Sequence, residues 1–170
     1  MLLLDQMPRN CHRGDEAAVA FTVFDPLARD VAAEAMARGI ADADPQVRWF
    51  ICRRMWFYLP LMHSEDLAMH ERATEGYARL AADMASLVAG EKDDEGDEVR
   101  ARAVRVMAGQ GERAMAMAEM QAGFEAKHMV IIQQFGRYPH RNKALGREST
   151  AEEIEYLANG GETFGGGQKD

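Results

Sequence analysis

The segment DPQVRWFICRRMWFYLP, residues 44–60, carries the strongest fold signal in the chain. Asp44 and Pro45 are residue types favoured at the N-cap and at the first position of a helix. Between Pro45 and Pro60 the apolar side chains fall on nearly every face of a helix, which is typical of a helix buried on all sides. We therefore expect one central buried helix after Asp44, which Pro60 must end or kink.

Similar start and stop signals divide the rest of the chain into helices. Asp25-Pro26 offers the same N-cap device, and Gly39 offers a stop. Further helices are expected from Ser64 to about Val88, over about 97–134 with a break near 109–111, and after the capping-box pattern Ser149-Thr150-Ala151-Glu152. No convincing strand pattern occurs, so the sequence predicts an all-α fold of antiparallel helical hairpins.

Composition fits one globular domain and excludes several functions. The chain has 170 residues, 47% of them hydrophobic and 28% charged, which is enough for a core. We expect a single all-helical domain over residues 1–159, followed by a mobile glycine-rich tail over 160–170. The net charge of −8 argues against binding to nucleic acid or to an anionic membrane. The acidic run over 91–98 is most simply a solvated connection.

Cysteine usage and the N-terminal sequence indicate a protein of a reducing compartment. Cys11 and Cys52 can form at most one bridge and show no CxxC spacing. The opening lacks an apolar signal core, and the longest apolar run, residues 55–62, is much shorter than the roughly 20 residues of a membrane span. We therefore predict a cytoplasmic protein. Leu2-Leu3-Leu4 looks like the end of a buried helix, as expected for a start codon inside a longer ancestral domain.

Three segments, residues 5–10, 63–66 and 136–149, carry polar side chains that helix packing alone does not demand; we call them the three polar segments. Turns at one end of an α-hairpin fold can converge, so the segments are expected to share one cleft. Residues 126–147 hold five Lys or Arg and no acid, and arginine binds carboxylate or phosphate through paired hydrogen bonds. The predicted partner is a small anionic ligand or an acidic peptide end. The predicted ligand-binding residues are Asp5, Arg9, Asn10, His63, Glu65, Asp66, Arg137, His140, Arg141, Asn142 and Arg147.

One alternative is that these charged side chains only hold the turns together. In that case arginines of the first and third polar segments pair with carboxylates of the first and second. The candidate pairs combine Arg9, Arg141 and Arg147 with Asp5, Glu65 and Asp66. The sequence leaves the oligomeric state open.

A second alternative is an acid–base or metal-assisted hydrolase that uses His63, Asp66 and His140. Zinc-binding HExxH spacing and the GxSxG nucleophile motif are both missing, so no metal and no cofactor are expected and no catalytic set is assigned. Among the other histidines, we expect His128 to be a hydrogen-bonded core residue and His70 to lie at the surface.

The polar segments and their flanks resemble the bacterial "domain of unknown function 924" family. The resemblance runs in order along nearly the whole chain, and its motifs are long and polar, which makes it specific. The matching blocks are LLDQMPRN (3–10), DPLA (25–28), FYLPLMHSEDL (57–67), FGRYPHRN (135–142) and LGREST (145–150).

The resemblance implies a tetratricopeptide-like helical fold and no assigned biochemical role. The family pattern usually has Phe in place of Met7 and Tyr138, and Gln in place of His70. Members also carry several dozen further residues upstream, including an aromatic-rich first helix. The resemblance therefore implies that this chain lacks the first helices of the family and that its first helix pair is incomplete.

Overall fold

The computed structural model describes residues 1–91 and 96–164, which form helices and connecting turns with no strand among them. The prediction of an all-α fold is confirmed; its tetratricopeptide-like detail stays a prediction. The α-helices are α1 (Gln6–Cys11), α2 (Ala17–Val19), α3 (Asp25–Ala37), α4 (Pro45–Arg48), α5 (Ile51–Arg54), α6 (Leu59–Met62), α7 (Leu67–Val88), α8 (Glu98–Met107), α9 (Gly111–Phe135) and α10 (Ala151–Ala158). Shorter 3-10 or π-helical turns are η1 (Gly14–Glu16), η2 (Ala20–Phe24), η3 (Met55–Phe57) and η4 (Pro139–Arg141).

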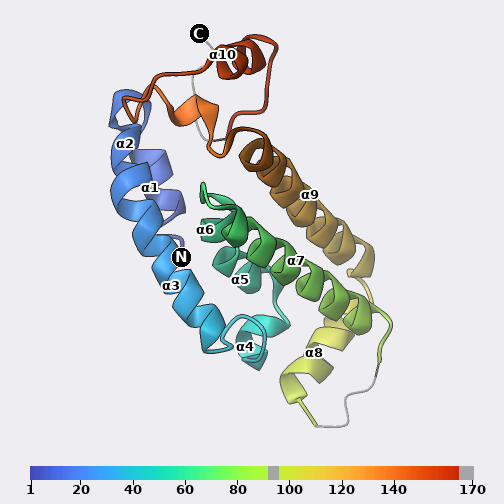
Figure 1. The fold of residues 1–170 in the computed structure, drawn as a ribbon. Helices are drawn as coiled ribbons and strands as arrows, with labels where there is room; N and C mark the ends of the chain where they lie inside the picture. The colour runs from blue at the N-terminus through green and yellow to red at the C-terminus, as the bar shows by residue number, and fades with distance from the viewer. Residues whose placement is uncertain (92–95, 165–170) are drawn as a thin grey trace.

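The two longest helices, α7 and α9, lie side by side and antiparallel, and α5 and α6 separate α7 from α3 (Figure 1). The main core fills the space between these layers. Its largest fully buried apolar side chains are Tyr58, Leu61, Met62, Tyr77, Leu80, Met84 and Leu87. Within the expected acidic connection and the expected tail, residues 92–95 and 165–170 lie outside the described residues.

Local signals set the helix ends. The Asp66 carboxylate accepts a hydrogen bond from the amide of Ala68 and caps α7, so the N-cap is Asp66 rather than the predicted Ser64. Gly136 ends α9 in a left-handed conformation, with a φ of 67° that favours glycine. The predicted break near 109–111 is confirmed, because α8 ends at Met107 and α9 begins at Gly111.

The prediction of one continuous helix over 45–59 is wrong. The segment is broken into α4, α5, η3 and α6, with Phe50 in an extended conformation between α4 and α5. The break coincides with contacts to three distant carboxylates: the indole of Trp49 donates to Asp97 at 2.7 Å, and the guanidinium of Arg54 lies between the carboxylates of Asp42 and Asp83. The expected burial on all sides is also wrong: α4 contains no buried residue, and α5 is exposed or half-buried except for Arg54.

Asp25 does not start a helix. The preceding residues of α2 and η2 are already helical, so the chain is helical from Ala17 to Ala37. The π-helical turn η2 comes directly before Pro26, whose ring would clash with the carbonyl of Thr22 in a regular α-helix. The Asp25 side chain is therefore free for contacts with other elements, described below.

Gly76 of α7 lies against the ring of Tyr58, and this close approach predicts a large effect of a single methyl group. A Cβ at Gly76 would lie 2.6 Å from Cε1 of Tyr58. We expect Gly76→Ala to lower the free energy of unfolding by about 1–3 kcal/mol, measured by urea denaturation. Gly123→Ala in α9 is the matched control: its Cβ would have no neighbour within 4 Å, so the change should stabilise by about 0.5–1 kcal/mol. Equal effects of the two changes would contradict this packing.

Candidate functional site

The three polar segments meet at one end of the helical bundle. This is the end where α1, the turn between α6 and α7, the last turn of α9 and η4 lie together (Figure 1). His63 contacts Asp5 of the first segment, and Glu65 accepts hydrogen bonds from Arg147 and from the backbone amide of Tyr138 in the third. Segments 60 to 80 residues apart in the sequence thus form one polar region.

Asp5 and Asp25 bind the guanidinium of Arg9 from two sides. Arg9 Nη2 lies 2.6 Å from Asp25 Oδ1 and 3.3 Å from Asp5 Oδ1, and the Nδ1 atom of His63 lies 2.7 Å from the same Asp5 oxygen. Burial alone would raise the pKa of Asp5, but His63 and Arg9 outweigh it and hold that pKa below its usual range. Asp5 is therefore ionised, and Arg9 pairs with two carboxylates.

Arg141 is buried without comparable partners. Its side chain is 5% exposed, and its one hydrogen bond among the described residues runs from Nη1 to Asp25 Oδ2 at 3.5 Å. The guanidinium lies over the rings of Phe21 and Tyr138, with Cζ 4.6 and 4.3 Å from the ring centroids. Its Nε is buried with no partner in the described chain. Burial and the nearby Arg9 lower the pKa of Arg141 to about 10.

Two histidines flank the ring of Tyr138 close to this arginine, and a third, His63, packs against one of them. The centroid of the Tyr138 ring is 5.9 Å from that of His128 and 5.5 Å from that of His140, and His63 lies 5.8 Å from His128. We call His63, His128, Tyr138, His140 and Arg141 the arginine–histidine cluster.

Several nitrogens of the arginine–histidine cluster are buried without a hydrogen bond. His128 donates from Nδ1 to the carbonyl of Phe124 at 2.7 Å, which leaves its Nε2 as an acceptor with no partner among the described residues. Neither ring nitrogen of His140 has a partner of good geometry there. Buried polar atoms are normally paired, so such a concentration marks a place where a ligand or water would bind.

His70, expected at the surface, is fully buried between α7 and α9. Its Nδ1 lies 2.8 Å from Oε1 of Glu125, and its Nε2 lies 2.9 Å from the carbonyl of Ser64. Burial raises the pKa of Glu125. Glu125 Oε2 and the Tyr77 hydroxyl are further buried atoms without partners among the described residues. The polar region therefore extends deeper into the core than the sequence indicated.

Other predicted site residues form ion pairs and hydrogen bonds that connect turns. Arg137 pairs with Glu153 at 2.6 Å, and Asn142 donates to the same carboxylate. Arg147 pairs with Glu65 at 2.6 Å. These contacts match the alternative in which charges hold the turns together.

Two predicted site residues lie apart from the arginine–histidine cluster. The exposed Asp66 caps α7 and makes no hydrogen bond to His63 in the described chain; Asp5 takes that place instead. Asn10 is exposed and donates to the carbonyl of Gln6. The expected open cleft is also different: three members of the cluster are buried, His63 and His140 are partly buried, and the ring of Phe164 lies on His128.

Asp25, Phe21 and Phe164 join the polar region but were not predicted as site residues. Asp25 belongs to the block DPLA that carries the family resemblance, which is the one signal that pointed to it. Polar sequence motifs could not reveal Phe21 and Phe164, because each contributes only an aromatic ring. Phe21 contacts the guanidinium of Arg141, and Phe164 stacks on the imidazole of His128.

In residues 1–91 and 96–164, no group of three His, Cys, Asp or Glu side chains is arranged to hold a metal ion. In the same residues, no helix is both long and apolar enough to span a bilayer.

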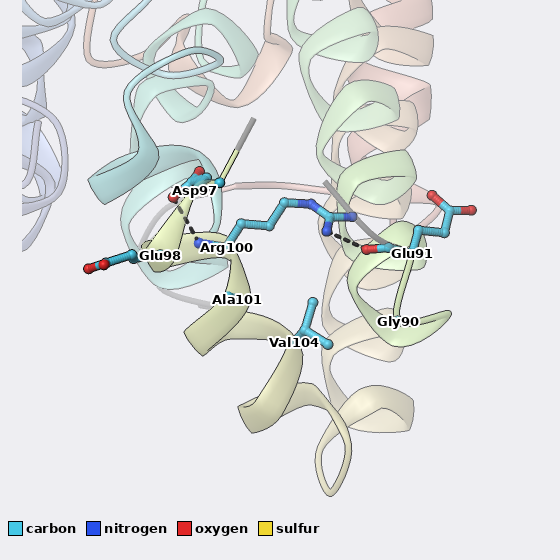
Figure 2. A pocket seen from close by; sticks show the side chains of 8 residues that line it. Gly90, Glu91, Asp97, Glu98, Arg100, Ala101 and Val104 are labelled. Carbon is cyan, nitrogen blue, oxygen red and sulfur yellow. Dashed lines mark hydrogen bonds between the residues drawn. The ribbon is translucent and has the colours of Figure 1, made fainter. Parts of the chain in front are cut away.

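A shallow cavity of about 390 Å³ lies elsewhere, between the end of α7 and the start of α8 (Figure 2). The side chain of Arg100 crosses it and donates to the carbonyl of Glu91, while the Asp97 carboxylate caps α8 beside it. These contacts tie the two helices together. The cavity is remote in sequence from the three polar segments and shares no residue with them.

Fold and site together define an all-helical protein with a buried arginine–histidine cluster at one end of its bundle. The chain belongs to the family described as bacterial protein of unknown function (DUF924), whose sequence model matches residues 1–161. A similar solved structure is that of a protein of unknown function, ATU0120, from Agrobacterium tumefaciens, with 34% identity and a TM-score of 0.55. The match covers 94% of this chain and 65% of the length of that protein. Among curated proteins, none matches.

The buried histidines predict that the folded protein loses stability as the pH is lowered. Burial lowers the pKa of His128 to about 3 and that of His140 to about 4, whereas an unfolded histidine titrates near 6.5. Between pH 6.5 and 5 the unfolded chain therefore binds protons that the folded chain does not, so acidification favours unfolding. Each histidine should lower the free energy of unfolding by up to about 1.4 kcal/mol for every pH unit of acidification in this range. In urea titrations at pH 7, 6 and 5, His128→Gln or His140→Gln should flatten this slope; an unchanged slope in both would refute the assignment.

Proposed function

We propose that the chain is a binding protein for a small oxyanion, a carboxylate or a phosphate, held at Arg141 in the arginine–histidine cluster. The observation that carries the proposal is the contrast among the arginines of the polar region. Arg9 and Arg147 each make a 2.6 Å contact with a carboxylate, whereas the one such contact of Arg141 in the described chain is 3.5 Å long; Nε of Arg141, like that of Arg147, is buried without a partner there.

An anion would supply what these buried groups lack. An unsatisfied buried donor or acceptor costs about 1–3 kcal/mol, and more when it is charged. Arg141 Nε offers a donor, His140 can donate from either ring nitrogen, and His128 Nε2 offers an acceptor. A partly protonated oxyanion such as dihydrogen phosphate, or a carboxylate with a bound water, matches this set. Binding would also relieve the repulsion between Arg141 and Arg9.

Thermal unfolding in the presence of anions tests the proposal. At constant ionic strength, phosphate or acetate should raise the Tm of the wild-type chain in a saturable way, reaching about 2.7 kcal/mol of stabilisation at 100 times Kd. Arg141→Met should abolish the shift. Arg147→Met is the matched control, because Arg147 is already paired with Glu65. No saturable shift in the wild type, or an equal shift in Arg141→Met, would contradict anion binding at this place.

A hydrolase is the second candidate, and the hydrogen bond between Asp5 and His63 is what favours it. A carboxylate that accepts from Nδ1 leaves Nε2 of the imidazole as a base, the arrangement that acid–base catalysis uses. His140 would be the second group, as the sequence indicated, with Asp5 in place of Asp66. Hydrolysis of an ester or phosphoester probe that is lost in His63→Gln but kept in Arg137→Met would support it.

A further inference from the structure

Phe164 covers the arginine–histidine cluster from the segment that follows α10. Its ring stacks on His128, with centroids 3.5 Å apart and an interplanar angle of 17°. The same ring meets Tyr138 and His140 nearly edge-on, at centroid distances of 6.3 Å each. Three side chains of two separate elements, α9 and the η4 region, thus form a slot with the shape of one aromatic ring.

A backbone hydrogen bond from Gly161 to the carbonyl of Tyr156 fixes the start of the segment that brings Phe164 there, and few side-chain contacts hold the rest. Lys127 pairs with Glu162 at 2.7 Å, but both side chains are about half exposed, and such a pair contributes little. The hydroxyl of Tyr156 donates to the carbonyl of Glu162 at 3.2 Å. Phe164 itself is only partly buried. A ligand can therefore compete with this segment at low cost.

The slot and Arg141 share a neighbour in the ring of Tyr138, and the one side-chain hydrogen bond of Arg141 among the described residues is the 3.5 Å contact with Asp25. Phe164 and Arg141 both contact the ring of Tyr138, the first at 6.3 Å between centroids and the second at 4.3 Å from Cζ to the centroid. His140, whose ring nitrogens have no partner in the described chain, contacts Tyr138 as well. A molecule with a ring in place of Phe164 would carry its substituent next to cationic and hydrogen-bonding groups.

We propose that the slot occupied by Phe164 is the aromatic subsite of the anion site, and that the ligand is an aromatic carboxylate. Its ring replaces Phe164 on His128, and its carboxylate binds Arg141. Phe164 is then an intramolecular cover that the ligand displaces. This inference rests on the proposed function, because it takes the anion site at Arg141 as given and adds the chemistry of the rest of the ligand.

Calorimetric titration of the full chain with three probes tests the inference. The probes are phenylacetate, acetate as the acid without a ring, and benzyl alcohol as the ring without a charge. Removing the cover in Phe164→Ala should tighten phenylacetate binding about tenfold or more, since the ligand ring no longer competes with Phe164 for burial. Acetate affinity should be unchanged, and benzyl alcohol should bind weakly to both proteins. Phe124→Ala, which deletes a half-exposed ring one turn before His128, should behave as the wild type.

A second readout uses the unmodified chain and does not depend on how the variants fold. Phe164 stacked on His128 shifts the ring-proton NMR signals of that histidine, and saturating phenylacetate should change this shift while acetate does not. Phenylacetate that binds Phe164→Ala no more tightly than acetate does, or a His128 signal that is indifferent to it, would overturn the aromatic subsite and leave anion binding standing. If neither anion binds any of the proteins, the proposed function itself fails.

Discussion

Replacing Arg54 by methionine is expected to lower the free energy of unfolding by about 3–4 kcal/mol. The Arg54 side chain is 1% exposed and lies between two carboxylates, with Nη2 2.7 Å from Asp42 Oδ1 and Nη1 2.6 Å from Asp83 Oδ2. Burial opposes its charge, but hydrogen bonds to Asp83, Tyr58 and Asp42 outweigh burial and raise the pKa of Arg54. Methionine would fill the space of the Arg54 side chain but would remove the cation that Asp42 and Asp83 share.

The loss should stay near the lower end of the range for a broken buried pair. Asp83 keeps a second partner in Arg48 at 2.7 Å, and Asp42 keeps Arg79 at 3.0 Å. Arg48→Met is the matched control, because Arg48 meets the same Asp83 from a more exposed position and should cost less than about 1 kcal/mol. Urea unfolding of both variants measures the two losses in the free energy of unfolding. Similar losses would contradict a special contribution from the buried position of Arg54.

Asp25→Asn is the second change expected to destabilise strongly, by about 3 kcal/mol. Asp25 is the nearest carboxylate to Arg141 and also binds Arg9 at 2.6 Å, so the neutral amide leaves a buried cation unpaired. The double variant Asp25→Asn/Arg141→Met should recover much of the loss, because the unpaired charge is then removed. Asp30→Asn, an exposed carboxylate on the same helix, is the control.

A double-mutant cycle on unfolding free energies measures this coupling. Additive effects of Asp25→Asn and Arg141→Met would contradict the electrostatic link between the two residues. Anions provide an independent check, since phosphate should stabilise Asp25→Asn more than the wild type if it binds next to Arg141.

Local signals made most of the helices predictable. Gly39, Gly90 and Gly136 adopt positive φ and follow helices close to where the sequence placed the stops, because a glycine at such a position acts through its own backbone. The interruption at Phe50 could not be predicted in this way. It depends on Asp97 for Trp49 and on Asp42 and Asp83 for Arg54, and these partners lie in the N-cap of α8, in the turn after α3 and in α7.

The same limit explains which parts of the site were missed. Convergence of the three polar segments was expected because turns at one end of a helical bundle can meet, and the structure brings Asp5, His63 and Arg141 into one region. Asp25 was interpreted as an N-cap because its local context, a following proline, is typical of one. Neither that context nor the glycine-rich setting of Phe164 reveals which distant side chain lies opposite.

The proposed anion contacts the buried guanidinium of Arg141, so the Nε–H NMR signal of this residue is its closest reporter. Arg54 is the internal control, because its Nε already donates to Tyr58 and Asp42. In an NMR titration with inorganic phosphate at constant ionic strength, anion binding at Arg141 should give a saturable shift of the Arg141 Nε–H, identified by its loss in Arg141→Met, and no shift of the Arg54 Nε–H. Two signals that stay still, or that drift together without saturating, would contradict it.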